Sequence, residues 1–246
     1  MSDEPSISVH DVEMFLGLGE GAFDHIPKYC RREALEAIAH VRRLERDHLL
    51  RSGVYYVALS DLTGATESSK TLGVEINKQR VESFITASVG SLGLSRPANY
   101  AQFVKTVGDA GLFLFSAFTD LFHWWTVMQS QMRLYSYEWG KDRDTALAGA
   151  FTLRAKTVFH VGEVNYSDDT DPVSAAVNDV FKIEKQFQPG ELGCTELGRI
   201  VAAPFFPDLG LTPEIRGEVA LPGSAAPVQT WVVAVDRYPE DHALGA

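Results

Sequence analysis

Asp61 is the residue in this chain whose type and setting first suggest chemistry. It ends an apolar run, 54–59, and the small polar segment Leu-Thr-Gly-Ala-Thr (62–66) follows it at once. This pattern predicts a buried strand that ends in a carboxylate and leads into a turn with exposed backbone N–H groups. Carboxylate oxygens bind Mg²⁺ or Mn²⁺, and clustered N–H groups bind phosphate oxygens. The stretch therefore predicts a strand tip that holds a metal together with phosphates.

A second carboxylate, Asp109, belongs to the same hypothesis. It follows Gly108 between two short apolar runs, 101–107 and 111–116, which is typical of a tight β-hairpin. Taken alone, either Asp61 or Asp109 is typical of a turn or cap residue. Two acids that converge from neighbouring strand tips instead suit divalent metal ions bound with a nucleoside triphosphate.

Alternating helix and strand patterns give the elements that must position these acids. We expect strands at 54–61, 101–107, 111–116, 151–164, 214–220 and 229–236, with helices at 74–94, 117–139 and 173–187. A central hairpin between interleaved helices and strands predicts an α+β fold, a ferredoxin-like βαββαβ sandwich followed by a terminal hairpin. We interpret the aromatic residues of 117–139 as core filling.

The first fifty residues differ in character from the rest. From Arg31 to Leu50, apolar residues recur every three or four positions with charges between them, which predicts a packing helix. We therefore expect an N-terminal helical extension over 1–50 and a second domain over 51–246.

Composition limits the class of partner. The chain has 246 residues, a net charge of −11 and a pI near 5.1, which argues against nucleic acid or an anionic membrane as its main partner. Its two cysteines lie far apart, and no metal-type cysteine spacing occurs. The polar, acidic N-terminal segment is unlike a signal peptide, and the apolar runs are too short or too broken to span a bilayer. We expect a cytoplasmic protein.

Four ordered blocks make the sequence resemble the class III nucleotidyl cyclase catalytic domain, the adenylate and guanylate cyclase family. They span about residues 54–200. The blocks are Ser60-Asp61-Leu62-Thr63-Gly64-Ala65-Thr66, Lys105-Thr106-Val107-Gly108-Asp109, His160-Val161-Gly162-Glu163-Val164 and Val177-Asn178-Asp179-Val180-Phe181-Lys182.

The resemblance implies roles for the residues of the first two blocks. Asp61 and Asp109 would hold two Mg²⁺ or Mn²⁺ ions, and Leu62 would add its backbone carbonyl. The phosphate-binding residues would be Thr63, Gly64, Ala65 and Thr66. The expected reaction is ring closure within a nucleoside triphosphate, which yields a 3′,5′-cyclic nucleotide and pyrophosphate.

The fourth block carries the remaining catalytic roles that the resemblance implies. Asn178 would position the ribose. Lys182 stands where the family usually has Arg, so the positive charge is kept and the bidentate fork is lost. In the family the metal-binding acids and the Asn/Arg pair come from different subunits, so we expect a homodimer with two shared sites.

Lys105 and Asp171 occupy the base-reading positions of adenylate cyclases. A Lys donor and an Asp acceptor match the edge of adenine, and they match cytosine equally well. Phe181 replaces a small residue and Ala65 replaces an aromatic one. If Phe181 points at the nucleotide, the pocket shrinks toward a pyrimidine; if it points into the core, it says nothing about the base.

Three hypotheses therefore stand. The layout favours a pyrimidine cyclase that makes cyclic CMP or cyclic UMP, like those of bacterial antiphage signalling. An adenylate cyclase that makes cyclic AMP is the second. A cyclase-like module that binds nucleotide or a partner without turnover is the third.

Overall fold

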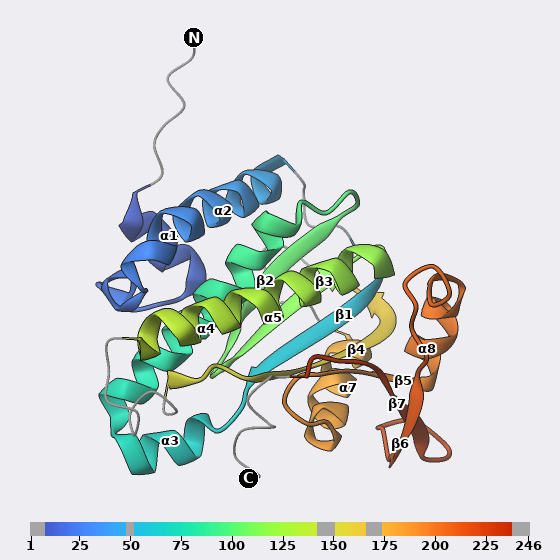
Figure 1. The fold of residues 1–246 in the computed structure, drawn as a ribbon. Coiled ribbons are helices and arrows are strands. Elements are labelled where there is room, and N and C mark those ends of the chain that lie inside the picture. The colour runs from blue at the N-terminus through green and yellow to red at the C-terminus, as the bar shows by residue number, and fades with distance from the viewer. Residues whose placement is uncertain (1–7, 48–51, 142–150, 166–173, 238–246) are drawn as a thin grey trace.

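A computed structural model describes residues 8–47, 52–141, 151–165 and 174–237 of the chain. Its strands form one seven-stranded sheet in the order β2-β3-β1-β4-β5-β7-β6 (Figure 1). The strands are β1 (Gly53–Leu62), β2 (Ala101–Val107), β3 (Ala110–Phe115), β4 (Ala155–Val164), β5 (Glu191–Thr195), β6 (Glu214–Val219) and β7 (Val228–Val235).

The centre of the sheet is β1, which pairs antiparallel with β3 on one side and with β4 on the other. The hairpin partner of β3 is β2, so the first four strands take the order β2-β3-β1-β4. This order is that of a ferredoxin-like sandwich, and it confirms the predicted βαββαβ fold. A parallel β5 and the β6–β7 hairpin extend the sheet beyond β4.

Helices cover both faces of the sheet (Figure 1). The longer helices are α2 (Lys28–Asp47), α4 (Val74–Ser95) and α5 (Phe118–Gly140). The shorter ones are α1 (Val9–Leu16), η1 (Ala22–His25), α3 (Ala65–Leu72), α7 (Ala175–Ile183), η3 (Glu184–Gln186), α8 (Glu196–Ala202) and η4 (Ala203–Phe205). Each helix of the described ranges is too short or too polar to cross a bilayer.

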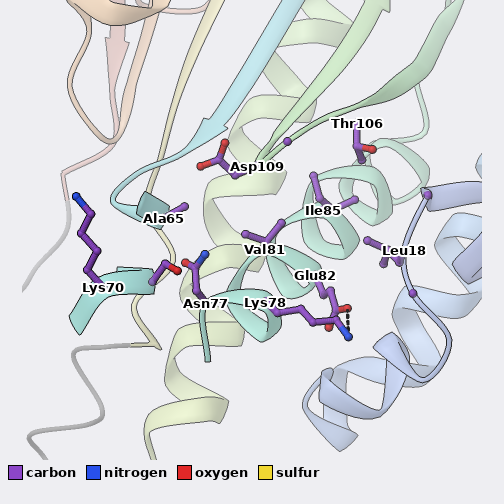
Figure 2. A pocket seen from close by; sticks show the side chains of 14 residues that line it. Leu18, Ala65, Lys70, Asn77, Lys78, Val81, Glu82, Ile85, Thr106 and Asp109 are labelled. Carbon is purple, nitrogen blue, oxygen red and sulfur yellow. Dashed lines mark ion pairs between the residues drawn. The ribbon is translucent and has the colours of Figure 1, made fainter. Parts of the chain in front are cut away.

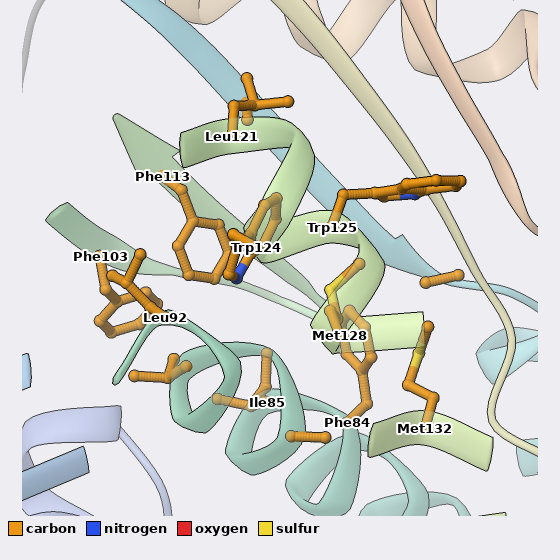
Figure 3. Close-up of a cluster of buried hydrophobic side chains, with 14 of the residues drawn as sticks. Phe84, Ile85, Leu92, Phe103, Phe113, Leu121, Trp124, Trp125, Met128 and Met132 are labelled. Carbon is orange, nitrogen blue, oxygen red and sulfur yellow. The ribbon is translucent and has the colours of Figure 1, made fainter. Parts of the chain in front are cut away.

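The larger core lies between the sheet and the pair α4 and α5. Trp124 of α5 is fully buried, packs on Phe113 and Phe115, and donates its indole N–H to the carbonyl of Ser88 at 2.9 Å (Figure 3). Trp125 is also buried. The aromatic residues of α5 therefore fill the core here, as the sequence predicted.

The opposite face carries a smaller cluster beneath α7. Val57, Leu59, Leu112 and Val158 of the sheet pack there with Val180 of α7. Side chains alternate between the two faces along each strand, so the odd-numbered residues of β1 face α7. Asp61 lies on this face.

The N-terminal helices share the larger core. Ile38 of α2 is fully buried in the same cluster as Leu92 of α4. The two helices meet at Gly93, where an added Cβ would lie 2.2 Å from the carbonyl oxygen of Ala37. The domain boundary at residue 50 remains a prediction.

Several local predictions were wrong. The expected strand at 151–164 begins only at Ala155, and the turn expected at 62–66 is shorter, because Ala65 and Thr66 already belong to α3. The sequence analysis also missed β5 and α8. The short strand β5 is buried along its whole length, so it lacks the alternation that marks a half-exposed strand.

Gly93→Ala should lower the free energy of unfolding by about 1–3 kcal/mol, because the new methyl group collides with the backbone of α2. Gly90→Ala is the matched control on the same helix. Its added Cβ meets nothing within 4 Å, and better helix propensity should stabilise the fold by about 0.5–1 kcal/mol. Urea unfolding of both variants measures this, and equal effects would contradict the tight contact between α2 and α4.

Candidate active site

Asp61 and Asp109 lie at the same end of the sheet. Asp61 stands opposite Ala110, the residue after Asp109, in the pairing of β1 with β3. The backbone N–H of Leu62 donates to the carbonyl oxygen of Asp109 at 3.2 Å. The pairing register thus places the two acids side by side, which the hairpin geometry had predicted.

The carboxylate of Asp61 sits in an unfavourable electrostatic setting. Its side chain is only 22% exposed. Burial, together with the negative charges of Glu184 and Asp109, raises the pKa of Asp61 to about 7, against the lowering effect of Lys156. Such a carboxylate gains from a nearby cation more than an exposed one does.

The backbone after Asp61 is held in place by the core. The N–H of Thr63 donates to the carbonyl of Arg154 at 2.8 Å, and the carbonyl of Thr63 accepts from the buried guanidinium of Arg80 at 3.4 Å. Gly64 then takes the left-handed conformation (φ 75°) before α3 begins at Ala65. The N-terminal N–H groups of α3 therefore open next to the two acids.

The donor set fits a divalent cation that is bound together with phosphates. Asp61 and Asp109 supply two carboxylates, and the buried hydroxyl of Thr63 has no hydrogen-bond partner among the described residues. The described part of the chain holds no group of three or more His, Cys, Asp or Glu side chains that could bind a metal alone. Mg²⁺ is commonly held by one or two carboxylates plus substrate phosphates, which is the set found here.

A cavity of about 630 Å³ adjoins this end of the sheet (Figure 2). Asp109 and Ala65 line it on the side of the turn, and Lys70 and Lys78 add positive charge. Lys78 is paired with Glu82 at 3.7 Å. The segment 17–19 of the N-terminal extension closes the far wall.

Asn178 and Lys182 are both exposed on α7, which packs over β4 and β1. Among the described residues, neither forms a hydrogen bond or an ion pair with Asp61 or Asp109. Phe181 between them is half-buried and packs against the cluster beneath α7. This contact gives Phe181 a packing role, so the residue lends little weight to a small base pocket.

Lys105 lies on β2 opposite Leu112 and faces the same side of the sheet as Asp61. Asp171, its expected partner in base recognition, lies outside the described residues. The base-reading pair therefore stays a prediction.

The sequence analysis missed two charged residues, Lys156 and Glu184. Lys156 of β4 stands directly opposite Asp61 in the strand pairing, with its Nζ 3.6 Å from Asp61 Oδ2. The same ammonium group forms an ion pair with Glu184, just after α7. Lys156 lies within the predicted strand before His160, but no local motif marks it, because its partners come from other elements.

No protein-family model matches the chain, and no curated protein gives a significant sequence match. Solved structures do match. The adenylyl cyclase CyaB from P. aeruginosa has a TM-score of 0.57 at 18% identity over 76% of this chain and 98% of that one. The guanylate cyclase domain of RhGC from Catenaria anguillulae, in complex with GTP, has a TM-score of 0.54 at 14% identity over 76% and 100%.

An adenylate/guanylate cyclase/hydrolase from Silicibacter pomeroyi has a TM-score of 0.53 at 17% identity over 76% of this chain and 99% of that chain. At sequence identities of 14–18%, the structural similarity establishes only the fold of the chain. The chain therefore has the fold of adenylyl and guanylyl cyclase catalytic domains, and it covers nearly the whole of each matched domain.

Asp61→Asn should stabilise the metal-free protein more at pH 8 than at pH 5. A carboxyl whose folded pKa is raised binds its proton more tightly in the folded state, so the ionised group costs stability that grows from about pH 4 to about pH 7. Melting temperatures in EDTA measure the difference, with the exposed Asp208→Asn as control. An equal gain at both pH values would contradict the assigned setting of Asp61.

Proposed function

We propose that the protein is a nucleotidyl cyclase that converts a nucleoside triphosphate into a 3′,5′-cyclic nucleotide and pyrophosphate. The observation that carries the proposal is that Asp61 and Asp109 lie next to each other at one end of the sheet, beside the N-terminus of α3. The similarity of the fold to adenylyl and guanylyl cyclase domains supports it.

Two divalent cations, Mg²⁺ or Mn²⁺, held by Asp61, Asp109 and the carbonyl of Leu62, would lower the pKa of the ribose 3′-hydroxyl and neutralise phosphate charge. The backbone N–H groups from Gly64 to Thr66 would bind the terminal phosphates, because the N–H of Thr63 already donates to the carbonyl of Arg154. Lys70 and Lys78 line the adjoining cavity together with Asp109, so they place positive charge near this acid.

The reaction forms one P–O bond and breaks another. The 3′-oxygen attacks the α-phosphorus, the bond from that phosphorus to the bridging oxygen breaks, pyrophosphate leaves, and the hydroxyl proton passes to solvent. Asn178 would hold the ribose by hydrogen bonds, which fixes the 3′-oxygen near the phosphorus. Lys182 would offset the negative charge that develops on the α-phosphate.

A homodimer with shared sites accounts for the position of α7. Asn178 and Lys182 are exposed and do not contact the acids of their own subunit. An isologous dimer would bring Asn178 and Lys182 of each subunit to the acids of the other subunit. Two equal sites would then form.

For the base, the proposal extends to one that presents a hydrogen-bond acceptor beside an amino group. Lys105 would donate to the acceptor and Asp171 would accept from the amino group. Cytosine and adenine both satisfy this pair, guanine does not, and uracil needs either other partners or a bridging water. A cyclic pyrimidine product would link the chain to the antiphage cyclases whose layout it resembles.

Mixed dimers test the shared site. Asp61→Asn and Asn178→Ala homodimers should each lose at least 100-fold in turnover with Mn²⁺ and CTP or ATP, because every site is defective. A co-expressed heterodimer, isolated through two different tags, should recover about half of wild-type turnover, since one of its two sites is intact.

The matched control is the heterodimer of Asp61→Asn with Asp109→Asn. Both substitutions remove acids, so each of its sites stays defective and no turnover should return. Recovery in this control, or none in the first heterodimer, would overturn the shared site. Full turnover by the folded Asp61→Asn homodimer would overturn the assignment of Asp61 as a metal ligand, whereas no cyclic product from wild type would overturn the cyclase assignment itself.

A further inference from the structure

Lys156 lies directly beside Asp61 of the candidate metal site. It lies across the strand pairing from Asp61, 3.6 Å from Oδ2, and is also paired with Glu184. The side chains of Lys156, Asp61 and Glu184 are 20%, 22% and 11% exposed. Solvent therefore screens these three charges weakly.

The side chains around Asp61 carry more negative than positive charge. The negative charges of Glu184 and Asp109 both act on Asp61, and among the described residues Lys156 is the cation paired with Asp61 and Glu184. An ammonium group beside Asp61 stabilises that carboxylate, and it also opposes the approach of a second cation. Any divalent ion that uses Asp61 must bind against this charge.

Glu184 holds the ammonium group of Lys156 in position through their ion pair. Its carboxylate makes the closer contact with Lys156, whereas Asp61 stands at ion-pair distance. The last turn of α7 and the start of η3 fix Glu184 over the beginning of β4. The acid therefore draws Lys156 away from full pairing with Asp61.

We propose that Lys156 and Glu184 are positioning residues that set the affinity of the Asp61 site for divalent cations. Lys156 competes with the cation for Asp61, and Glu184 restrains that competition by holding the ammonium group. The inference rests on the proposed function, because it takes Asp61 as a metal ligand.

Substitutions of the two members of this ion pair should then change the affinity for Mn²⁺ in opposite directions. Lys156→Met removes the competing charge, so Mn²⁺ should bind about tenfold more tightly. Glu184→Gln keeps the shape but releases Lys156 to pair with Asp61, so Mn²⁺ should bind about tenfold more weakly. The double variant should return near the wild-type value, because one negative and one positive charge are removed together.

The test is a Mn²⁺ titration of the purified full chain without nucleotide, in which electron paramagnetic resonance measures free Mn²⁺. Lys185→Met is the matched control, since Lys185 follows Glu184 but is exposed, and its affinity should equal that of wild type. Asp61→Asn should lose the Asp61-dependent binding. Circular dichroism confirms that each variant is folded.

The outcomes separate the two proposals. Opposite shifts in Lys156→Met and Glu184→Gln support the inference. Shifts in the same direction, or none, while Asp61→Asn abolishes binding, overturn the inference and leave the metal site standing. Wild-type binding in Asp61→Asn, or no binding by wild type, overturns the metal assignment and the inference together. If Lys156→Met does not fold, unchanged Mn²⁺ affinity in Glu184→Gln still overturns the inference.

Discussion

The rest of the site depends on a partly buried carboxylate at the end of the central strand. Because β1 has a neighbour on each side, Asp61 cannot turn toward open solvent at a sheet edge. Its neighbours are the hairpin that carries Asp109 and the strand that carries Lys156. Burial next to other acids is unfavourable unless a cation compensates it. The proposed cation site therefore depends on the position of this one residue in the fold.

The two faces of the sheet have different roles. The face under α4 and α5 is a closed aromatic core, and it also receives the N-terminal helices. The face under α7 carries Asp61, Lys105 and Lys156. A shift of one residue in the register of β1 would move Asp61 into the aromatic core, so the hydrophobic pattern of this strand also fixes the site.

The sequence predicted the fold well where its patterns were long. The apolar run 54–59, the Gly108-Asp109 turn and the helical spacing of 74–94 led to the correct βαββαβ order. Short or fully buried elements were not predicted, among them β5 and the polar helix α3, whose first two residues were assigned to a turn. The proximity of Asp61 and Asp109 could be expected from the predicted sandwich, in which the first strand lies beside the central hairpin.

Contacts between distant elements could not be expected in the same way. Lys156 and Glu184 stand far from Asp61 along the chain, and only the pairing of β1 with β4 and the packing of α7 bring them together. The half-buried position of Phe181 was also undecided by the sequence, because one helix position can serve either a pocket or a core. Its packing against the smaller cluster answers part of that question.

The most direct measurement of the central claim is a product analysis. Purified protein is incubated with Mn²⁺ and with ATP, GTP, CTP or UTP separately, and the products are identified by mass. We expect a 3′,5′-cyclic monophosphate and equimolar pyrophosphate from CTP, UTP or ATP, and none from GTP. The absence of cyclic product from all four triphosphates, with folded and dimeric protein, would contradict this expectation.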